Sequence, residues 1–140
     1  MFPSRAVVLV LIAVLGNACG GDEGPSAPQM PEPISVTGSW SGSMVTSFGG
    51  ARTLSMILQE ANSTISGSYA ITVPDSEPYW TGTVQGERAG DSLSLSLPGS
   101  DGAGSVGTVE FSGEVTGADS IEGVLNGSGW FDTPIVLTRQ

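Results

Sequence analysis

The sequence predicts an all-β fold: a single antiparallel up-and-down meander barrel of about eight short strands, following a signal peptide and a linker. Long helices are disfavoured by the composition, because 140 residues include 21 glycines and 9 prolines. From residue 36 onward, apolar residues alternate with Ser, Thr and Gly at period two, which is typical of half-buried strands. The gaps between these runs are too short for parallel crossovers, which take a dozen or more residues.

The first segment, residues 1–18, predicts an export signal. Arg5 supplies a positive charge ahead of the apolar run AVVLVLIAVL, residues 6–15. A membrane-spanning helix needs roughly 20 apolar residues, so this run is too short to cross a bilayer. Its length is that of the hydrophobic core of a signal peptide.

The residues Gly16-Asn17-Ala18-Cys19 resemble the lipobox of bacterial lipoproteins, in which a peptidase cuts before a cysteine that carries diacylglycerol. The usual lipobox has Leu three residues before the cysteine; here Gly16 holds that place and Leu15 lies one residue further back. The resemblance implies a lipoprotein with lipid, including palmitate, on Cys19. Gly20, where some inner-membrane lipoproteins carry Asp, favours the cell outer membrane. The alternative is an ordinary secretory signal with a chance cysteine nearby.

Residues 19–34 predict the lipidated cysteine and a linker. The stretch GGDEGPSAPQMPEP contains four prolines, which prevent regular hydrogen bonding and favour polyproline II. A spacer is favoured over a protein-binding proline motif. Residues 35–140 then form the single domain.

Eight runs with apolar residues or glycine at alternate positions predict the strands: 36–44, 54–58, 65–73, 80–86, 93–97, 109–115, 121–125 and 131–137. In the last run, Phe131 is expected to face inward with Thr133, Ile135 and Leu137. Turn clusters separate the runs at 48–50, 61–63, 74–78, 88–90, 98–102, 117–119 and 126–127. With one apolar face per strand and no helix to cover it, the sheet can close on itself as a barrel or fold into a sandwich, and a glycine repeat supports closure.

A weak repeat of the form apolar-x-Gly-x-apolar occurs at 65–69, 80–84, 111–115 and 121–125. Each glycine falls on the inward parity, where it either relieves the bend of a small barrel or leaves room for a ligand. Bending is the favoured interpretation. The opposite arrangement, with apolar faces toward lipid, needs longer strands and aromatic girdles that these runs lack.

Charge and missing residue types narrow the functions. The chain has 14 acidic residues against 4 arginines, with no lysine or histidine, so a nucleic-acid partner is not expected. A serine nucleophile would lack a His or Lys base, and a zinc site would lack its usual ligands. The carboxylates Glu110 and Glu114 lie on the outward parity, and Asp101 lies in a glycine-rich loop where a turn is favoured over a calcium site. We therefore expect no enzyme, no metal and no cofactor.

Gly38-Ser39-Trp40 resembles the G-x-W motif of the calycin barrels, meaning lipocalins, fatty-acid-binding proteins and avidins. Arg139, at the end of the last run, is placed like the basic residue that packs over that tryptophan. The resemblance implies that Gly38, Trp40 and Arg139 close the barrel. Residues 65–69 resemble the T-G-x-Y strand of avidins, but Gly42 stands where avidins carry a polar biotin contact, so biotin binding is not implied.

Two classes of function remain. In the first, the protein is a membrane-anchored binding module whose barrel mouth takes a small apolar ligand, and the candidate lining residues are Trp40, Met44, Met56, Tyr69 and Trp80. In the second, it is a structural or protein-interaction lipoprotein of the cell envelope with a solid barrel. The two classes differ in whether the barrel holds a cavity.

Overall fold

The computed structural model describes residue 28, residues 31–46 and residues 49–140. The predicted signal peptide, Cys19 and most of the linker lie outside these residues. All the strands lie within the compact unit Glu32–Gln140. Within the described ranges, no helix has the length and apolarity needed to cross a membrane.

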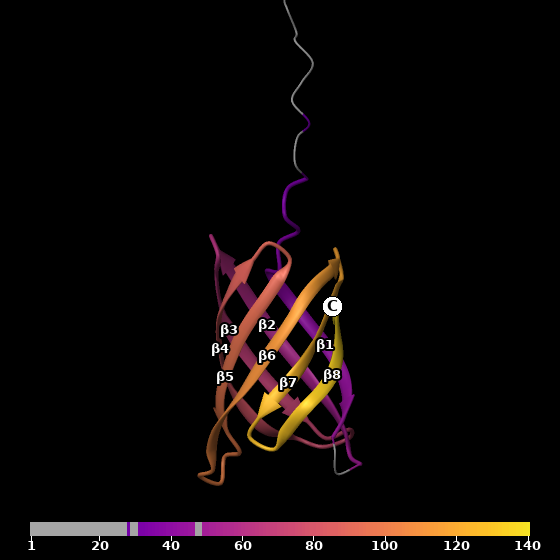
Figure 1. The fold of residues 1–140 in the computed structure, drawn as a ribbon. Helices are drawn as coiled ribbons and strands as arrows, with labels where there is room; N and C mark the ends of the chain where they lie inside the picture. Colours follow the sequence, from indigo (N-terminus) through magenta and orange to yellow (C-terminus); the bar gives the residue numbers. More distant parts are fainter. Residues whose placement is uncertain (1–27, 29–30, 47–48) are drawn as a thin grey trace, which may run out of the picture. The chain divides into compact units, whose positions relative to one another are not determined.

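Eight antiparallel strands close into a barrel, which confirms the predicted fold class (Figure 1). Each strand pairs with the next, and β8 returns to pair with β1, where Trp40 lies opposite Arg139. The strands are β1 (Gly38–Val45), β2 (Ala51–Ala61), β3 (Thr64–Thr72), β4 (Pro78–Ala89), β5 (Ser92–Ser100), β6 (Val106–Gly117), β7 (Ser120–Gly127) and β8 (Trp130–Arg139).

The two ends of the barrel differ in their connections. At one end, two-residue turns at 62–63, 90–91 and 118–119 join consecutive strands, and residues 34–37 cross this end before β1 begins. We call it the plugged end. At the other end the connections 46–50, 73–77 and 101–105 are longer and only the β7–β8 turn, 128–129, has two residues; we call it the open end. Three predicted turns were wrong in position: β4 continues through Arg88 to Ala89, β5 continues through Pro98 to Ser100, and β7 includes Asn126 and Gly127, so the β7–β8 turn is 128–129. Arg88 is therefore a buried strand residue.

The barrel interior is filled by alternating inward side chains, and its inward glycines serve packing. The Phe111 ring is fully buried, and a Cβ added at Gly113 or Gly123 would lie 2.7 or 2.6 Å from it. At four other inward glycines an added Cβ would collide with a backbone oxygen of the neighbouring strand, namely at Gly42, Gly67, Gly82 and Gly86. These glycines allow close strand approach and ring packing, and they leave no room for a ligand at these positions.

The prediction that Phe131 faces inward was wrong, because an extra residue in β8 inverts the alternation. Leu125 of β7 pairs with Thr133, whereas Gly127 pairs with Trp130, so β8 uses one more residue than β7 over this interval. Asp132 adopts a φ of 41° within the irregularity. As a result Trp130 is buried and Phe131 is 70% exposed. A bulge of this kind re-aims side chains at a barrel rim.

A buried ion pair holds the chain across the plugged end. Arg88 Nη1 lies 3.1 Å from Glu60 Oε1, and the two side chains are only 4% and 13% exposed. Each partner also bonds the crossing segment: Arg88 donates to the carbonyl of Ile34 at 2.5 Å, and Glu60 accepts from the amide of Val36 at 2.9 Å. Val36 itself is fully buried, so the segment acts as a lid on the core.

The second clamp on the plugged end is made by Arg139. Its guanidinium carbon lies 4.4 Å from the centroid of the Trp40 ring, and its nitrogens donate to the carbonyls of Ser35 and Thr37 at 2.7 and 2.6 Å. The Trp40 indole donates in turn to the carbonyl of Val36 at 2.8 Å. A Cβ at Gly38 would lie 2.6 Å from Arg139 Nη1, so a glycine makes room for the guanidinium. The structure thus brings together the three residues to which the calycin resemblance points.

We expect Arg139→Ala to lower the thermal unfolding midpoint by several degrees. The guanidinium–indole contact is worth about 0.5 to 2 kcal/mol, and the variant also leaves two carbonyls of the crossing segment without their donor. Arg52→Ala, at the opposite end of the barrel, is the matched control. Equal midpoints for the two variants, measured by circular dichroism, would show that Arg139 contributes no more than a peripheral arginine.

We expect Arg88→Met to destabilise the domain more strongly, by about 3 to 5 kcal/mol, because the Glu60 carboxylate would remain buried without its partner. Urea unfolding gives this free energy directly. The double variant Glu60→Gln/Arg88→Met should recover part of the loss. A double variant whose loss equals the sum of the two single losses would mean that the two side chains are not energetically coupled.

Candidate functional site

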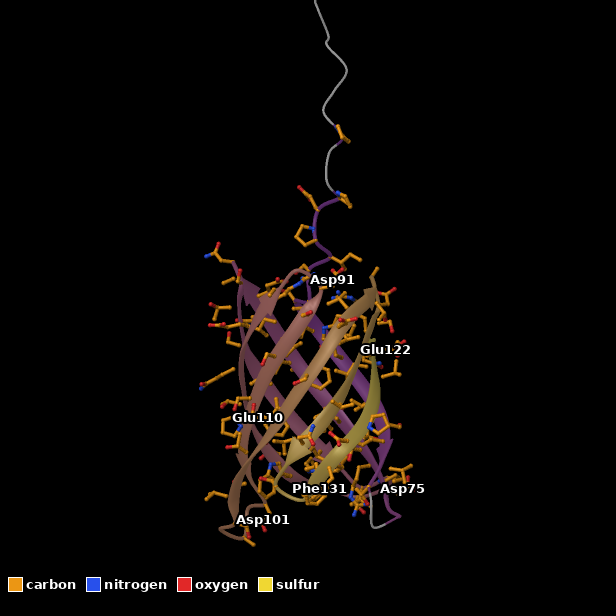
Figure 2. All side chains as sticks on the ribbon, viewed as in Figure 1. Asp75, Asp91, Asp101, Glu110, Glu122 and Phe131 are labelled. Atoms are coloured by element: carbon orange, nitrogen blue, oxygen red, sulfur yellow. The ribbon has the colours of Figure 1, made fainter. Side chains whose placement is uncertain are left out.

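A pocket of about 380 Å³ opens at the open end of the barrel. We call it the mouth pocket, and its lining residues are Thr46, Arg52, Tyr79, Trp80, Asp101, Ser105, Ser128, Gly129 and Trp130. Figure 2 shows Asp101, Asp75 and Phe131 at this end, with Asp91 at the plugged end. The pocket is therefore separated by the filled core from the segment that crosses the plugged end.

Two strand irregularities bring the aromatic walls to the pocket. In β4, Trp80 pairs with Ile71 while Pro78 pairs with Thr72, so Tyr79 is an extra residue beside Trp80. The bulge lets both consecutive aromatic residues line one pocket, which regular alternation would prevent. On the opposite side, the β7–β8 turn passes through Gly127 and Gly129, both with positive φ, and delivers Trp130.

A hydrogen-bonded pair fixes the orientation of Trp80. The Trp80 indole N–H donates to the Tyr69 hydroxyl at 2.8 Å, and that hydroxyl donates to the carbonyl of Leu97 at 2.8 Å. Burial raises the pKa of the Tyr69 phenol, and the hydrogen bond from Trp80 only partly opposes this effect, so the hydroxyl stays protonated. An added Cβ at Gly99 would collide with the Tyr69 oxygen, so this position must stay small. The pair forms a rigid floor behind the pocket.

The two charged residues of the pocket are held differently. Asp101 Oδ1 accepts from the amides of Ala103 and Ser105 at 2.8 and 3.0 Å. Hydrogen bonds from Ser105 and then Ala103 hold the pKa of this carboxyl below its usual value, so Asp101 is ionised and organises its own loop, as the predicted turn expects. Arg52 lies over the Tyr79 ring at 5.3 Å and donates to the carbonyl of its neighbour Ala51 at 2.8 Å.

Of the five predicted ligand-binding residues, the structure brings two to this region. Trp80 lines the pocket and Tyr69 supports it from behind. Trp40 lies at the plugged end beneath Arg139, and Met44 and Met56 are buried with the rest of the core. These three do not line the mouth pocket, because their side chains are used to fill the interior.

Arg52, Tyr79 and Trp130 are the largest of the pocket residues that were not among the sequence candidates. Arg52 shares the inward parity of Leu54 and Met56. This parity indicated a charged side chain that faces inward near one end of the barrel. Tyr79 and Trp130 carried no such signal, because each depends on a bulge that one sequence does not reveal.

The carboxylate clusters lie on the outer wall. Glu110 accepts a hydrogen bond from the Ser96 hydroxyl at 3.0 Å on the exposed face, and Glu114 pairs across the ladder with Glu122. Glu110 and Glu122 both appear on the outside of the barrel in Figure 2. In the described residues no group of three or more His, Cys, Asp or Glu is arranged to hold a metal ion.

No protein-family model matches the chain, and no curated protein matches its sequence. Solved structures do match in fold. A redesigned β-barrel, mFAP0, bound to DFHBI aligns with a TM-score of 0.61 and 17% identity, over 74% of this chain and 97% of that one. A de novo designed fluorescence-activating β-barrel gives 0.60 and 20%, over 74% and 93%, and the redesigned barrel mFAP1 bound to DFHBI gives 0.59 and 14%, over 74% and 94%. The chain is similar to these proteins in being a single closed antiparallel eight-stranded barrel.

Proposed function

We propose that the domain binds a small, largely apolar ligand in the mouth pocket. The observation that carries this proposal is the gathering of Tyr79, Trp80 and Trp130 around one pocket at the open end. Its volume, about 380 Å³, lies within the range of about 300 to 1,000 Å³ typical of small-molecule sites. Aromatic walls with a few polar groups are the usual lining of such sites.

Two further observations support a binding role. Two strand bulges place aromatic side chains at the pocket, and Trp80 is fixed by Tyr69, so the walls are organised before any ligand arrives. Pre-organisation reduces the entropy that binding would cost. In addition, two barrels of similar fold, mFAP0 and mFAP1, hold the small molecule DFHBI.

We also propose that the domain is tethered to the outer membrane through lipid on Cys19. Support comes from the lipobox-like residues and from the charge of the chain, since an acidic surface is repelled by anionic headgroups and would need a covalent anchor. The chain enters the barrel at the plugged end, where Val36 is buried. A tether at that end leaves the mouth pocket at the end away from the attachment point.

The binding role predicts saturable quenching of tryptophan fluorescence when the soluble domain, residues 32–140, is titrated with small apolar molecules, DFHBI among them. Trp80→Leu should weaken the binding about tenfold or more, because it removes one aromatic wall and the partner of Tyr69. Trp130 supplies the remaining signal in that variant. Native mass spectrometry of the purified domain should detect a retained adduct.

Ile57→Ala is the control for this experiment, since Ile57 is an apolar residue 57% exposed on the outer wall, outside the mouth pocket. It should leave the titration unchanged. A flat titration together with an adduct-free mass would refute the binding role. It would favour the structural or protein-interaction lipoprotein, for which the filled interior is the supporting observation.

The tether predicts that the full-length chain, expressed in a bacterial host with lipoprotein processing, incorporates labelled palmitate. Cys19→Ser should abolish the labelling, because the only thiol of the chain is removed. Fractionation should find the wild type with the membranes and the variant released from them. Equal labelling of the two chains would rule out lipid on Cys19.

A further inference from the structure

The three arginines of the described residues differ in the number of hydrogen bonds and ion pairs that they make. Arg88 and Arg139 each donate to at least two backbone carbonyls and each lie within 4.0 Å of a carboxylate. Both belong to the plugged end. Arg52 has one hydrogen bond, to the adjacent carbonyl of Ala51, and one stacking contact with Tyr79. It is the arginine that lines the mouth pocket.

The contacts of Arg52 leave part of its donor capacity unused. Its Nε is buried and finds no hydrogen-bond acceptor among the residues that the structure describes. Arg88 Nη2 also lacks a hydrogen bond there, but it lies 3.8 Å from the Asp91 carboxylate. A buried donor without a partner is costly, so a position that supplied an acceptor would be favoured. The Arg52 guanidinium rests over Gly50, where an added Cβ would lie 2.6 Å from Nη1. Moving it toward the pocket would break only one hydrogen bond.

The other charged residue of the pocket, Asp101, already accepts hydrogen bonds on one carboxylate oxygen. The Oδ1 oxygen of Asp101 accepts two backbone amides of its own loop, and it makes no ion pair with Arg52. A ligand cation would therefore meet a carboxylate with one oxygen already bonded, whereas a ligand anion would meet a guanidinium whose buried Nε–H has no acceptor among the described residues. This difference favours an anionic ligand over a cationic one.

We propose that the mouth pocket selects planar aromatic carboxylates, with the ring between Tyr79, Trp80 and Trp130 and the carboxylate on Arg52. The inference rests on the proposed binding function and specifies its ligand class. A guanidinium binds a carboxylate through two parallel N–H bonds, which are charge-assisted and stronger than neutral ones. Offset stacking on indole and phenol rings favours flat ligands.

Isothermal titration calorimetry with 2-naphthoate and its neutral isostere 2-naphthamide tests this on residues 32–140. The wild type should bind naphthoate several-fold more tightly than naphthamide, and the preference should shrink as salt is raised. Arg52→Gln should weaken naphthoate binding about tenfold and leave naphthamide binding unchanged. Arg52→Lys should retain part of the preference, because it keeps the charge but loses the planar fork.

Ser66→Glu is the matched control: it shifts the net charge by the same one unit as Arg52→Gln, at an exposed position of β3 outside the pocket. It should change neither affinity appreciably. Thermal midpoints would confirm that each variant is folded. Equal binding of the two ligands, unaffected by Arg52→Gln, would overturn the assignment of Arg52 while leaving a binding site in place. Absence of binding by both ligands and by every molecule in the fluorescence titration would overturn the binding function as well.

Discussion

Closure of β1 on β8 is the constraint on which the rest of the structure depends. The ladder at this seam is much shorter than at the other seams, since β1 and β8 pair in register only at Trp40–Arg139 and Ser41–Thr138. An open sheet would expose both its edges and its apolar face. Arg139 strengthens the β1–β8 seam at the plugged end, because the same side chain covers Trp40 and binds the carbonyls of the segment that leads into β1. The contacts of Arg139 thus both close the barrel and hold the segment that covers the core.

The position of Arg88 at the plugged end follows from the backbone groups that the crossing segment must satisfy there. A lid made of backbone must satisfy its carbonyls and amides as it leaves water. Arg88 and Glu60 do this as a pair, one donating to Ile34 and the other accepting from Val36, while neutralising each other. Such buried pairs define geometry more than they add stability. Here they define where the chain crosses the barrel.

The open end carries a pocket where the plugged end is covered by a chain segment. Its longer connections leave room for a pocket, and two bulges turn aromatic side chains into that room, while the interior beneath is filled by residues such as Phe111. A barrel of about eight strands is just wide enough for its own side chains to fill it. A ligand site in such a barrel is therefore expected at the mouth. The loosely held guanidinium of Arg52 gives this mouth its single positive charge among the described residues.

The sequence by itself determined the strands and their antiparallel order, because period-two alternation and short turns are local properties. Closure into a barrel rather than a sandwich was favoured only by the weak glycine repeat, and the pairing of β1 with β8 decided it. The pairing of Trp40 with Arg139 could be anticipated only from the resemblance of Gly38-Ser39-Trp40 to a known motif. The tertiary structure alone decided which aromatic residues meet. The extra residue Tyr79 shifts the pairing of β4 with β3. The extra residue in β8 exposes Phe131 and turns Trp130 inward. A bulge is chosen by the match between neighbouring strands, and that match exists only once they are paired.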